Sequence, residues 1–172
     1  MRPNLKRLRP FPIFGPGPTA SPPRAEQLAP YPAELIALSR EMGGGATGFD
    51  AGARFRPDQP SGFEDWQGYL HIDFFYGCAG DSYGLLDRTA FLHEQEGIFG
   101  ETCLAIAECA GGDMLLYRVE DGAVAFWKHD VAGHFHAAIV RDLPSLLERL
   151  EPELDEAGQV PPQWSAPGQI GA

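Results

Sequence analysis

The chain has few cysteines, no long apolar segment and few basic residues, and each shortage excludes a class of protein. Its cysteines, Cys78, Cys103 and Cys109, are odd in number and lack CxxC spacing, so we expect neither a disulfide framework nor a structural zinc site. The longest apolar runs, such as residues 137–140, are far shorter than the roughly 20 residues that span a bilayer. The sequence therefore predicts buried thiols, no bound metal and no membrane-spanning helix.

Positive charge is scarce as well, with 13 basic against 24 acidic residues and a net charge of −11 among 172 residues. Five of the basic residues lie within the first 24 positions, which contain no acidic residue, so eight basic residues accompany all 24 acidic ones in the rest of the chain. An acidic surface repels nucleic acid and attracts basic partners. Acidity also serves solubility alone, so the charge predicts no nucleic-acid ligand and leaves a basic protein partner open.

Prolines are concentrated in the first 30 residues, which hold eight of the 16 in the chain. Because proline lacks a backbone donor and fixes φ, we expect a basic arm over residues 1–30 without a long helix or a central strand. Phe11, Ile13 and Phe14 predict that part of this arm packs on the body. The prolines also interrupt the apolar stretch that a secretory signal requires, which favours a cytoplasmic location.

Residues 31–155 contain enough apolar side chains for one core, and their periodicity alternates between that of helices and that of strands. The predicted helices cover residues 32–42, 85–96 and 143–154, and the predicted strands cover residues 70–76, 102–107, 114–119, 123–128 and 136–140. Between the first helix and the first strand, residues 46–68 are rich in Gly, Pro and Asp. We expect an ordered loop there, with a short helix around Glu64 to Trp66.

Local signals place several boundaries within this domain. The three glycines at 43–45 end the first helix, Asp121-Gly122 predicts a tight hairpin, and Asp142 is the expected N-cap of the last helix. Leu154 continues the apolar face of that helix, which Pro152 ends or bends. Residues 156–172 are expected to form a flexible tail. The predicted fold class is α+β, with a mostly antiparallel or mixed sheet covered by helices.

A collinear series of motifs runs through these elements. In chain order it comprises Gly43-Gly44 after a helix, Phe75-Tyr76-Gly77 after a strand, Leu104-Ala105-Ile106-Ala107, Gly111-Gly112-Asp113, Val124 to His129 with Trp127, and the amphipathic helix from Leu143. In order and spacing the series resembles the SUKH superfamily of Smi/Knr-type domains over residues 30–154. The resemblance implies a SUKH-like fold in which Gly43, Gly44, Tyr76, Gly77, Gly111, Gly112, Asp113, Trp127 and His129 are motif residues that build the scaffold.

The resemblance also implies a function, that of a bacterial immunity protein that binds and neutralises a cognate polymorphic toxin without catalysis or a cofactor. If the toxin is a nuclease, its substrate groove is basic and acidic side chains of this chain would take the place of phosphates. The candidate contact residues lie in predicted loops or on polar faces: Asp58, Glu64, Asp65, Asp73, Asp81, Asp87, Glu94, Glu96, Glu120 and Asp121.

Two other classes of function stay open. A regulatory or scaffold protein would use the same domain to hold a cellular partner, with the proline-rich arm as an extra docking segment. A metal-dependent enzyme would use His129 with His134 and His136, because residues two apart on a strand face the same way. No HExxH pattern supports such chemistry, and Gly43-Gly44 follows a helix whereas a phosphate-binding loop precedes one. The oligomeric state is not predicted.

Overall fold

The protein is described by a computed structural model that places residues 3–14, 23–79, 83–96, 102–131, 135–154 and 158–159. The predicted α+β class is confirmed, because seven strands form one sheet in which each strand pairs antiparallel with the next along the chain. The strands are β1 (Pro10–Phe14), β2 (Ala46–Phe55), β3 (Leu70–Phe75), β4 (Cys103–Cys109), β5 (Asp113–Arg118), β6 (Val124–Trp127) and β7 (Phe135–Val140). The helices are α1 (Pro3–Arg7), α2 (Ala25–Leu28), α3 (Ala33–Glu41), α4 (Leu85–Glu96) and α5 (Leu143–Arg149).

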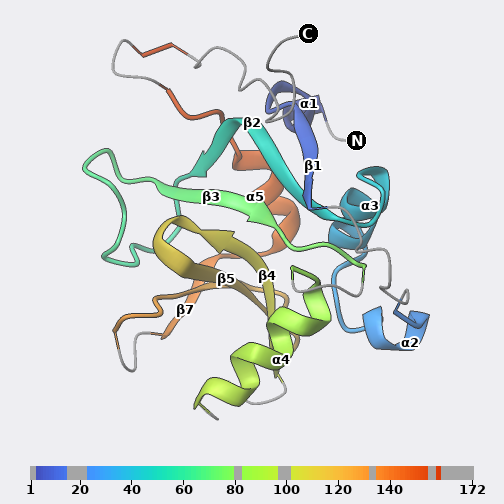
Figure 1. The fold of residues 1–172 in the computed structure, drawn as a ribbon. Helices are drawn as coiled ribbons and strands as arrows, with labels where there is room; N and C mark the ends of the chain where they lie inside the picture. Colours follow the sequence, from blue (N-terminus) through green and yellow to red (C-terminus); the bar gives the residue numbers. More distant parts are fainter. Residues whose placement is uncertain are drawn as a thin grey trace, which may run out of the picture.

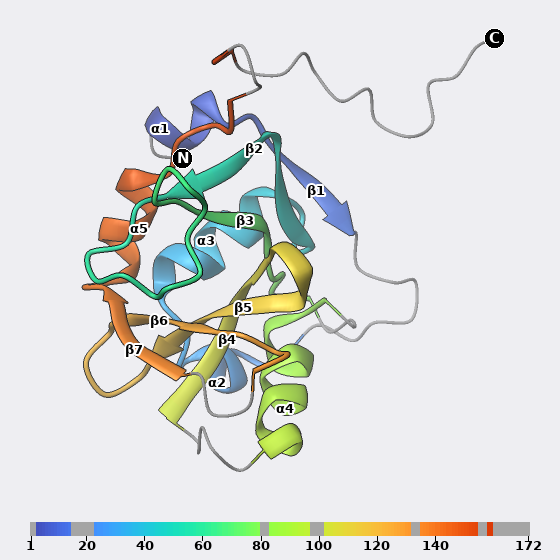
Figure 2. The same cartoon turned by 90° about the vertical axis from the view of Figure 1, so that its left-hand side faces the viewer.

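The helices pack around a strongly curved sheet (Figures 1 and 2). Helix α4 lies along β4, while α3 contacts β2. Helix α5 follows β7 directly and contacts α1, and the chain after it pairs with β2 through the bridge between Arg54 and Glu151. Helix α5 and the residues after it therefore connect the last strand of the sheet to the second.

The middle of the chain folds as its local signals predict. Helix α4 begins and ends at the expected residues, and Leu85, Thr89 and Leu92 on its inner face are buried. The hydroxyl of Tyr31 donates to Thr89 Oγ1 at 2.7 Å, and the backbone N–H of Ala105 donates to the same atom at 3.0 Å. The buried threonine thus accepts two hydrogen bonds, which tie the helix to β4 and to the segment before α3.

Two predicted turn and cap signals are also confirmed. The β5–β6 hairpin closes at Gly122, whose φ of +76° is a conformation that glycine adopts without strain. Its ends are joined by the N–H of Arg118, which donates to the carbonyl of Ala123 at 2.9 Å. Asp142 caps α5, because its carboxylate accepts the N–H of Ser145 at 2.7 Å.

Residues 46–55 form strand β2, so the prediction of a loop there is wrong. The pairing of β2 with β3 shifts register between Gly48 and Ala53, and Gly52 has a φ of +65°. The glycines that suggested a loop bend a strand instead. A Cβ on Gly48 would come within 2.3 Å of the Ile13 side chain, so glycine also lets β1 lie close against β2.

Two further expectations are wrong. No short helix forms at residues 64–66, because Glu64 and Asp65 have no regular secondary structure and Trp66 begins a turn. Helix α5 ends at Arg149, because Leu150 has an extended ψ of 127° before Pro152 is reached. Leu154 accordingly leaves the helical face and is exposed.

The proline-rich start of the chain is part of the sheet. Leu5 of α1 and Leu8 just after it are buried in the core, and β1 is the edge strand beside β2. The carbonyl of Arg9 accepts the N–H of Asp50, so the alternate residues Pro10 and Pro12 direct their backbone groups away from β2. Prolines are therefore placed where no ladder hydrogen bond is lost.

Gly77 lies where the backbone after α3 and the backbone after β3 come into contact. A Cβ on Gly77 would lie 2.5 Å from the carbonyl carbon of Gly45 and 2.6 Å from the carbonyl oxygen of Gly44. Tyr76 beside it is fully buried, and all three cysteines are buried and free. Among the described residues, no helix has the length and apolar character that crossing a bilayer requires.

Candidate functional site

The loop between β2 and β3 contains a tryptophan whose side chain is exposed to solvent. Trp66 is 91% exposed. The backbone beside it is fixed, because the N–H of Gly68 donates to the carbonyl of Asp65 at 2.9 Å. The Asp65 carboxylate also accepts the N–H groups of Gln67 and Tyr69 at 2.8 and 2.9 Å. An ordered turn therefore presents the indole.

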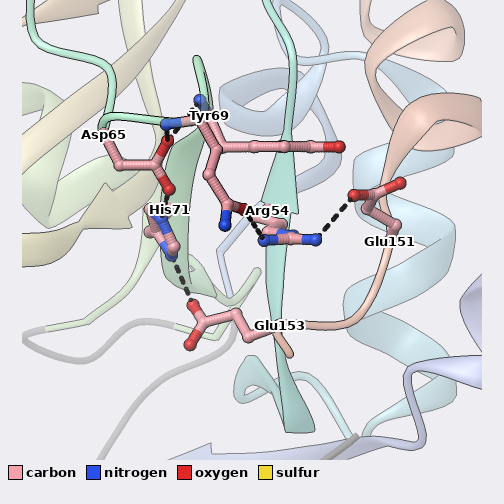
Figure 3. A network of polar contacts seen from close by, with 7 residues as sticks. Arg54, Asp65, Tyr69, His71, Glu151 and Glu153 are labelled. Atoms are coloured by element: carbon pink, nitrogen blue, oxygen red, sulfur yellow. Dashed lines mark hydrogen bonds and ion pairs between the residues drawn. The ribbon is translucent and has the colours of Figure 1, made fainter. Parts of the chain in front are cut away.

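His71 joins this turn to the segment after α5 (Figure 3). Its Nε2 lies 3.0 Å from Asp65 Oδ2, and its Nδ1 lies 2.9 Å from Glu153 Oε1. The hydrogen bond to Glu153 is the largest influence on the ring and, despite partial burial, the two carboxylates raise the pKa of His71 to about 9. At neutral pH His71 is thus a cation with both nitrogens donating, which makes it a structural link rather than a general base.

Arg54 makes a second link between the same segments (Figure 3). Its guanidinium donates to Gln67 Oε1 at 3.1 Å, contacts Glu151 Oε1 at 3.2 Å and lies 4.1 Å from the centroid of the Tyr69 ring. The backbones of Arg54 and Glu151 exchange two hydrogen bonds of 3.0 Å. Residues 151–154 therefore lie along β2, held by both backbone and side chains.

A groove of about 480 Å³ opens on the other side of this segment. Apolar side chains from three neighbouring strands form its walls. They are Phe11 and Ile13 of β1, Phe49 of β2, and Ile72 and Phe74 of β3. Three carboxylates, those of Asp50, Asp73 and Glu153, also line it. The groove thus combines an apolar interior with negative charge, and its size falls within the range of roughly 300–1,000 Å³ typical of binding sites.

The three carboxylates of the groove differ in their partners. Asp50 contacts Arg9 at 3.5 Å, and Glu153 contacts His71. Asp73 has neither a hydrogen bond nor an ion pair with any residue that the structure describes. The Asp73 side chain is exposed, and its pKa is raised by desolvation from the surrounding residues and by the nearby charges of Glu108 and Glu153, against the lowering effect of the His71 charge. A cation brought to Asp73 would relieve this unfavourable field.

Most of the ten carboxylates predicted as contacts lie away from this region. Asp58 pairs with Arg149 at 2.6 Å, Glu64 accepts hydrogen bonds within its own loop from Ser61 and Gly62, and Asp121 pairs with Arg118 in the hairpin turn. The side chains of Asp87, Glu94 and Glu120 are exposed elsewhere on the surface. Asp81 and the side chain of Glu96 lie outside the described residues.

Of the other two predicted carboxylates, Asp65 belongs to the Trp66 turn and contacts His71, whereas Asp73 lines the groove. The sequence interpretation missed Glu151 and Glu153, which it assigned to a continuing helix. Pro152 between them, already expected to end or bend the helix, was the available signal, because a proline three residues past the last helical residue indicates an extended segment whose alternate side chains face the same way.

The histidine cluster is only partly within the described residues. His134 lies outside them, and His136 is described by its backbone in β7 alone. His129 Nδ1 lies 3.0 Å from Asp113 Oδ1, which connects two of the motif residues across the β4–β5 and β6–β7 turns. The predicted set of three histidines is thus not assembled by the described side chains.

Asp113, His129 and Asp130 offer ligand atoms that lie within 4.8 Å of one another. However, Lys128 Nζ lies 3.3 Å from Asp113 Oδ2 and 3.1 Å from Asp130 Oδ1. An ammonium group already neutralises the two carboxylates that a metal ion would have to share. Metal binding at this position would require displacement of Lys128.

Comparisons of the chain with protein families, with curated proteins and with solved structures gave no match.

Proposed function

We propose that this chain is a non-catalytic protein-binding domain, namely an immunity protein of the SUKH type that binds and neutralises a cognate toxin in the bacterial cytoplasm. The observation that carries the binding role is Trp66, a large aromatic side chain 91% exposed on an ordered turn. Tryptophan is strongly enriched among the few interface residues that supply most of the binding free energy. Because the turn is already ordered, little conformational entropy is lost when a partner covers the indole.

Charge supports a basic partner. The chain carries a net charge of −11, and the carboxylates of Glu151, Glu153 and Asp73 lie on the segments next to the Trp66 turn. Complementary charge raises the association rate and selects against acidic competitors. A nuclease toxin, whose substrate groove is basic, fits this requirement, and binding to it would weaken as salt concentration rises.

The polar clusters among the described residues favour binding over catalysis. His71 is held between two carboxylates and is protonated at neutral pH. Asp113 is held by Lys128 and His129. In each cluster the titratable groups are engaged with one another, whereas a general base needs a free lone pair directed at substrate.

The test is growth rescue by co-expression with the C-terminal domain of the protein that the adjacent gene encodes. We expect the wild-type chain to restore growth and to co-purify with that domain. Trp66→Ala should weaken binding by about 30-fold or more, the effect of losing a central aromatic anchor. Phe91→Ala, which removes a partly exposed aromatic from α4, is the matched control and should retain rescue.

Equal melting temperatures for both variants and the wild type would show that loss of rescue reports binding rather than unfolding. Absence of rescue by the wild-type chain would contradict the immunity role and favour a regulatory or scaffold function. Full rescue by Trp66→Ala would contradict the role of the turn.

A further inference from the structure

The groove beside residues 151–154 is built from parts of the chain that are far apart in sequence. Phe11 and Ile13 are two apart on edge strand β1 and so face the same side. Gly48 of β2 leaves the space that the Ile13 side chain occupies. Glu153 closes one end, because its backbone N–H donates to the carbonyl of Ala51 at 3.0 Å and a Cβ on Gly52 would collide with its side chain.

We propose that this groove takes a lysine or arginine side chain of the protein partner, together with the apolar side chain next to it in the partner's sequence. The cation would pair with Asp73, and the apolar neighbour would lie against Phe11, Ile13 and Phe49. This inference rests on the proposed binding function and specifies the chemistry of the partner segment.

The charges in the groove select this occupant over the alternatives. Arg9 neutralises Asp50, and His71 neutralises Glu153, so Asp73 is the carboxylate of the lining left without a cationic partner among the described residues. An acidic or purely apolar segment would bury Asp73 next to Glu153 with only the charge of His71, which already bridges Glu153 and Asp65, in compensation, which is unfavourable. A second copy of this acidic chain would bring negative charge to a negative groove and is disfavoured for the same reason.

The groove and the tryptophan turn are joined by one short segment of the chain. Glu153 lines the groove and also holds His71. Its neighbour Leu154 lines, with Trp66 and His71, a second hollow of about 340 Å³. Two consecutive residues therefore belong one to the groove and one to the hollow beside the indole.

The direct test is a titration of the full chain with two short peptides followed by ¹⁵N–¹H correlation spectra. The first peptide is acetyl-Gly-Leu-Lys-Leu-Gly-amide, and the second replaces lysine by norleucine, which keeps the alkyl chain and removes the charge. We expect the lysine peptide to shift the amide signals of residues 11–13, 49–53 and 72–74, with a dissociation constant on the order of 1 mM. The norleucine peptide should bind about fivefold more weakly, as expected for one ion pair at a partly exposed site.

The matched variants are Asp73→Asn and Asp87→Asn. Asp87 lies in the first turn of α4 and does not line the groove, so its replacement changes the net charge equally without changing the site. Asp73→Asn should abolish the preference for lysine over norleucine, and Asp87→Asn should preserve it. Equal affinity of the wild type for both peptides, shifts outside the groove, or shifts that follow protein concentration without peptide would overturn the inference.

The rescue assay separates this inference from the proposed function. If the wild-type chain rescues growth and Asp73→Lys rescues equally well, the groove proposal is wrong and the immunity proposal stands. If the wild type gives no rescue but the lysine preference depends on Asp73, the groove binds cationic segments and the immunity proposal is wrong.

Discussion

The two ends of the sheet are held together in different ways. At the β4–β6 end, neighbouring strands follow one another through glycine turns at 111–112 and 122, so most contacts join residues close in sequence. At the β1–β2 end, the contacts join the first and last parts of the domain: α1 packs on α5, and Arg54 pairs with Glu151. The candidate binding features, Trp66 and the groove, belong to this second end.

The β4–β6 end therefore has the character of a scaffold, whereas the β1–β2 end carries the candidate binding site. Hairpins with short closures form at a small cost in chain entropy, and five of the nine motif residues named in the sequence analysis lie there. The β1–β2 end depends on contacts over nearly the whole chain, and its polar links join the buried Arg54 and the partly exposed His71 to more exposed glutamates. Substitutions at the two ends should therefore affect stability and binding in different proportions.

The largest effect should come from Gly77→Ala, at the junction of the two ends. The added methyl group would overlap backbone atoms of Gly44 and Gly45 rather than a flexible side chain. We expect a loss of about 3–4 kcal/mol in the free energy of unfolding, measured with urea. Gly111→Ala adds the same methyl group where no atom lies within 4 Å and should cost only about 1 kcal/mol for its positive φ. Similar losses in the two variants would mean that the junction is not tightly packed.

Leu8→Ala tests whether the N-terminal segment is integral to the domain. Leu8, the residue after α1, is fully buried, whereas Lys6 within α1 is exposed. Removal of the buried side chain should cost about 2–3 kcal/mol, while Lys6→Ala should change stability by less than about 0.5 kcal/mol. An unchanged urea midpoint for Leu8→Ala would indicate that this segment is an appendage, contrary to the arrangement described above.

His71 should make the β1–β2 end sensitive to pH. Its pKa is raised from 6.5 to about 9 in the folded chain, so the folded state binds the proton more tightly. The stabilisation is complete below about pH 6.5 and is lost as pH rises through 9. Allowing for screening by solvent, we expect about 1–2 kcal/mol.

Urea unfolding of the wild type and of Glu153→Gln at several pH values between about 6 and 10 measures this contribution. The substitution removes the main cause of the raised pKa of His71 and should flatten the dependence over that interval. Identical pH profiles for the two proteins would contradict the link between His71 and the C-terminal segment.

The smallest predicted effect lies on the locally encoded helix α5. Asp142→Ala removes the side-chain acceptor for the N–H of Ser145 and should cost about 1 kcal/mol. Asp142→Asn keeps an acceptor and should recover most of the loss, which urea midpoints would resolve. Failure of asparagine to recover stability would mean that charge at the helix terminus, not the hydrogen bond, stabilises α5.

These two kinds of organisation explain what could be predicted from the sequence. The bounds of α4, the hairpin at Gly122 and the cap at Asp142 depend on neighbouring residues and are readable from them. Strand β2 was missed because Gly48 and Gly52 suit its bend only when Ile13 and Glu153 lie against it, and such partners are remote in sequence. Of the site, Asp65 and Asp73 were named from local polarity, but their separate roles depend on the same remote contacts.

The prolines of β1 have a consequence for the behaviour of the protein at high concentration. An incoming strand at this edge would meet carbonyl groups at Pro10 and Pro12 but no amide hydrogens, so its own carbonyls would be left without donors. Edge-to-edge pairing of sheets, the first step of many aggregates, is therefore disfavoured on the side of the molecule that bears the groove of Phe11 and Ile13. The apolar lining of this groove can then stay open to solvent without promoting association of the chain through strand β1.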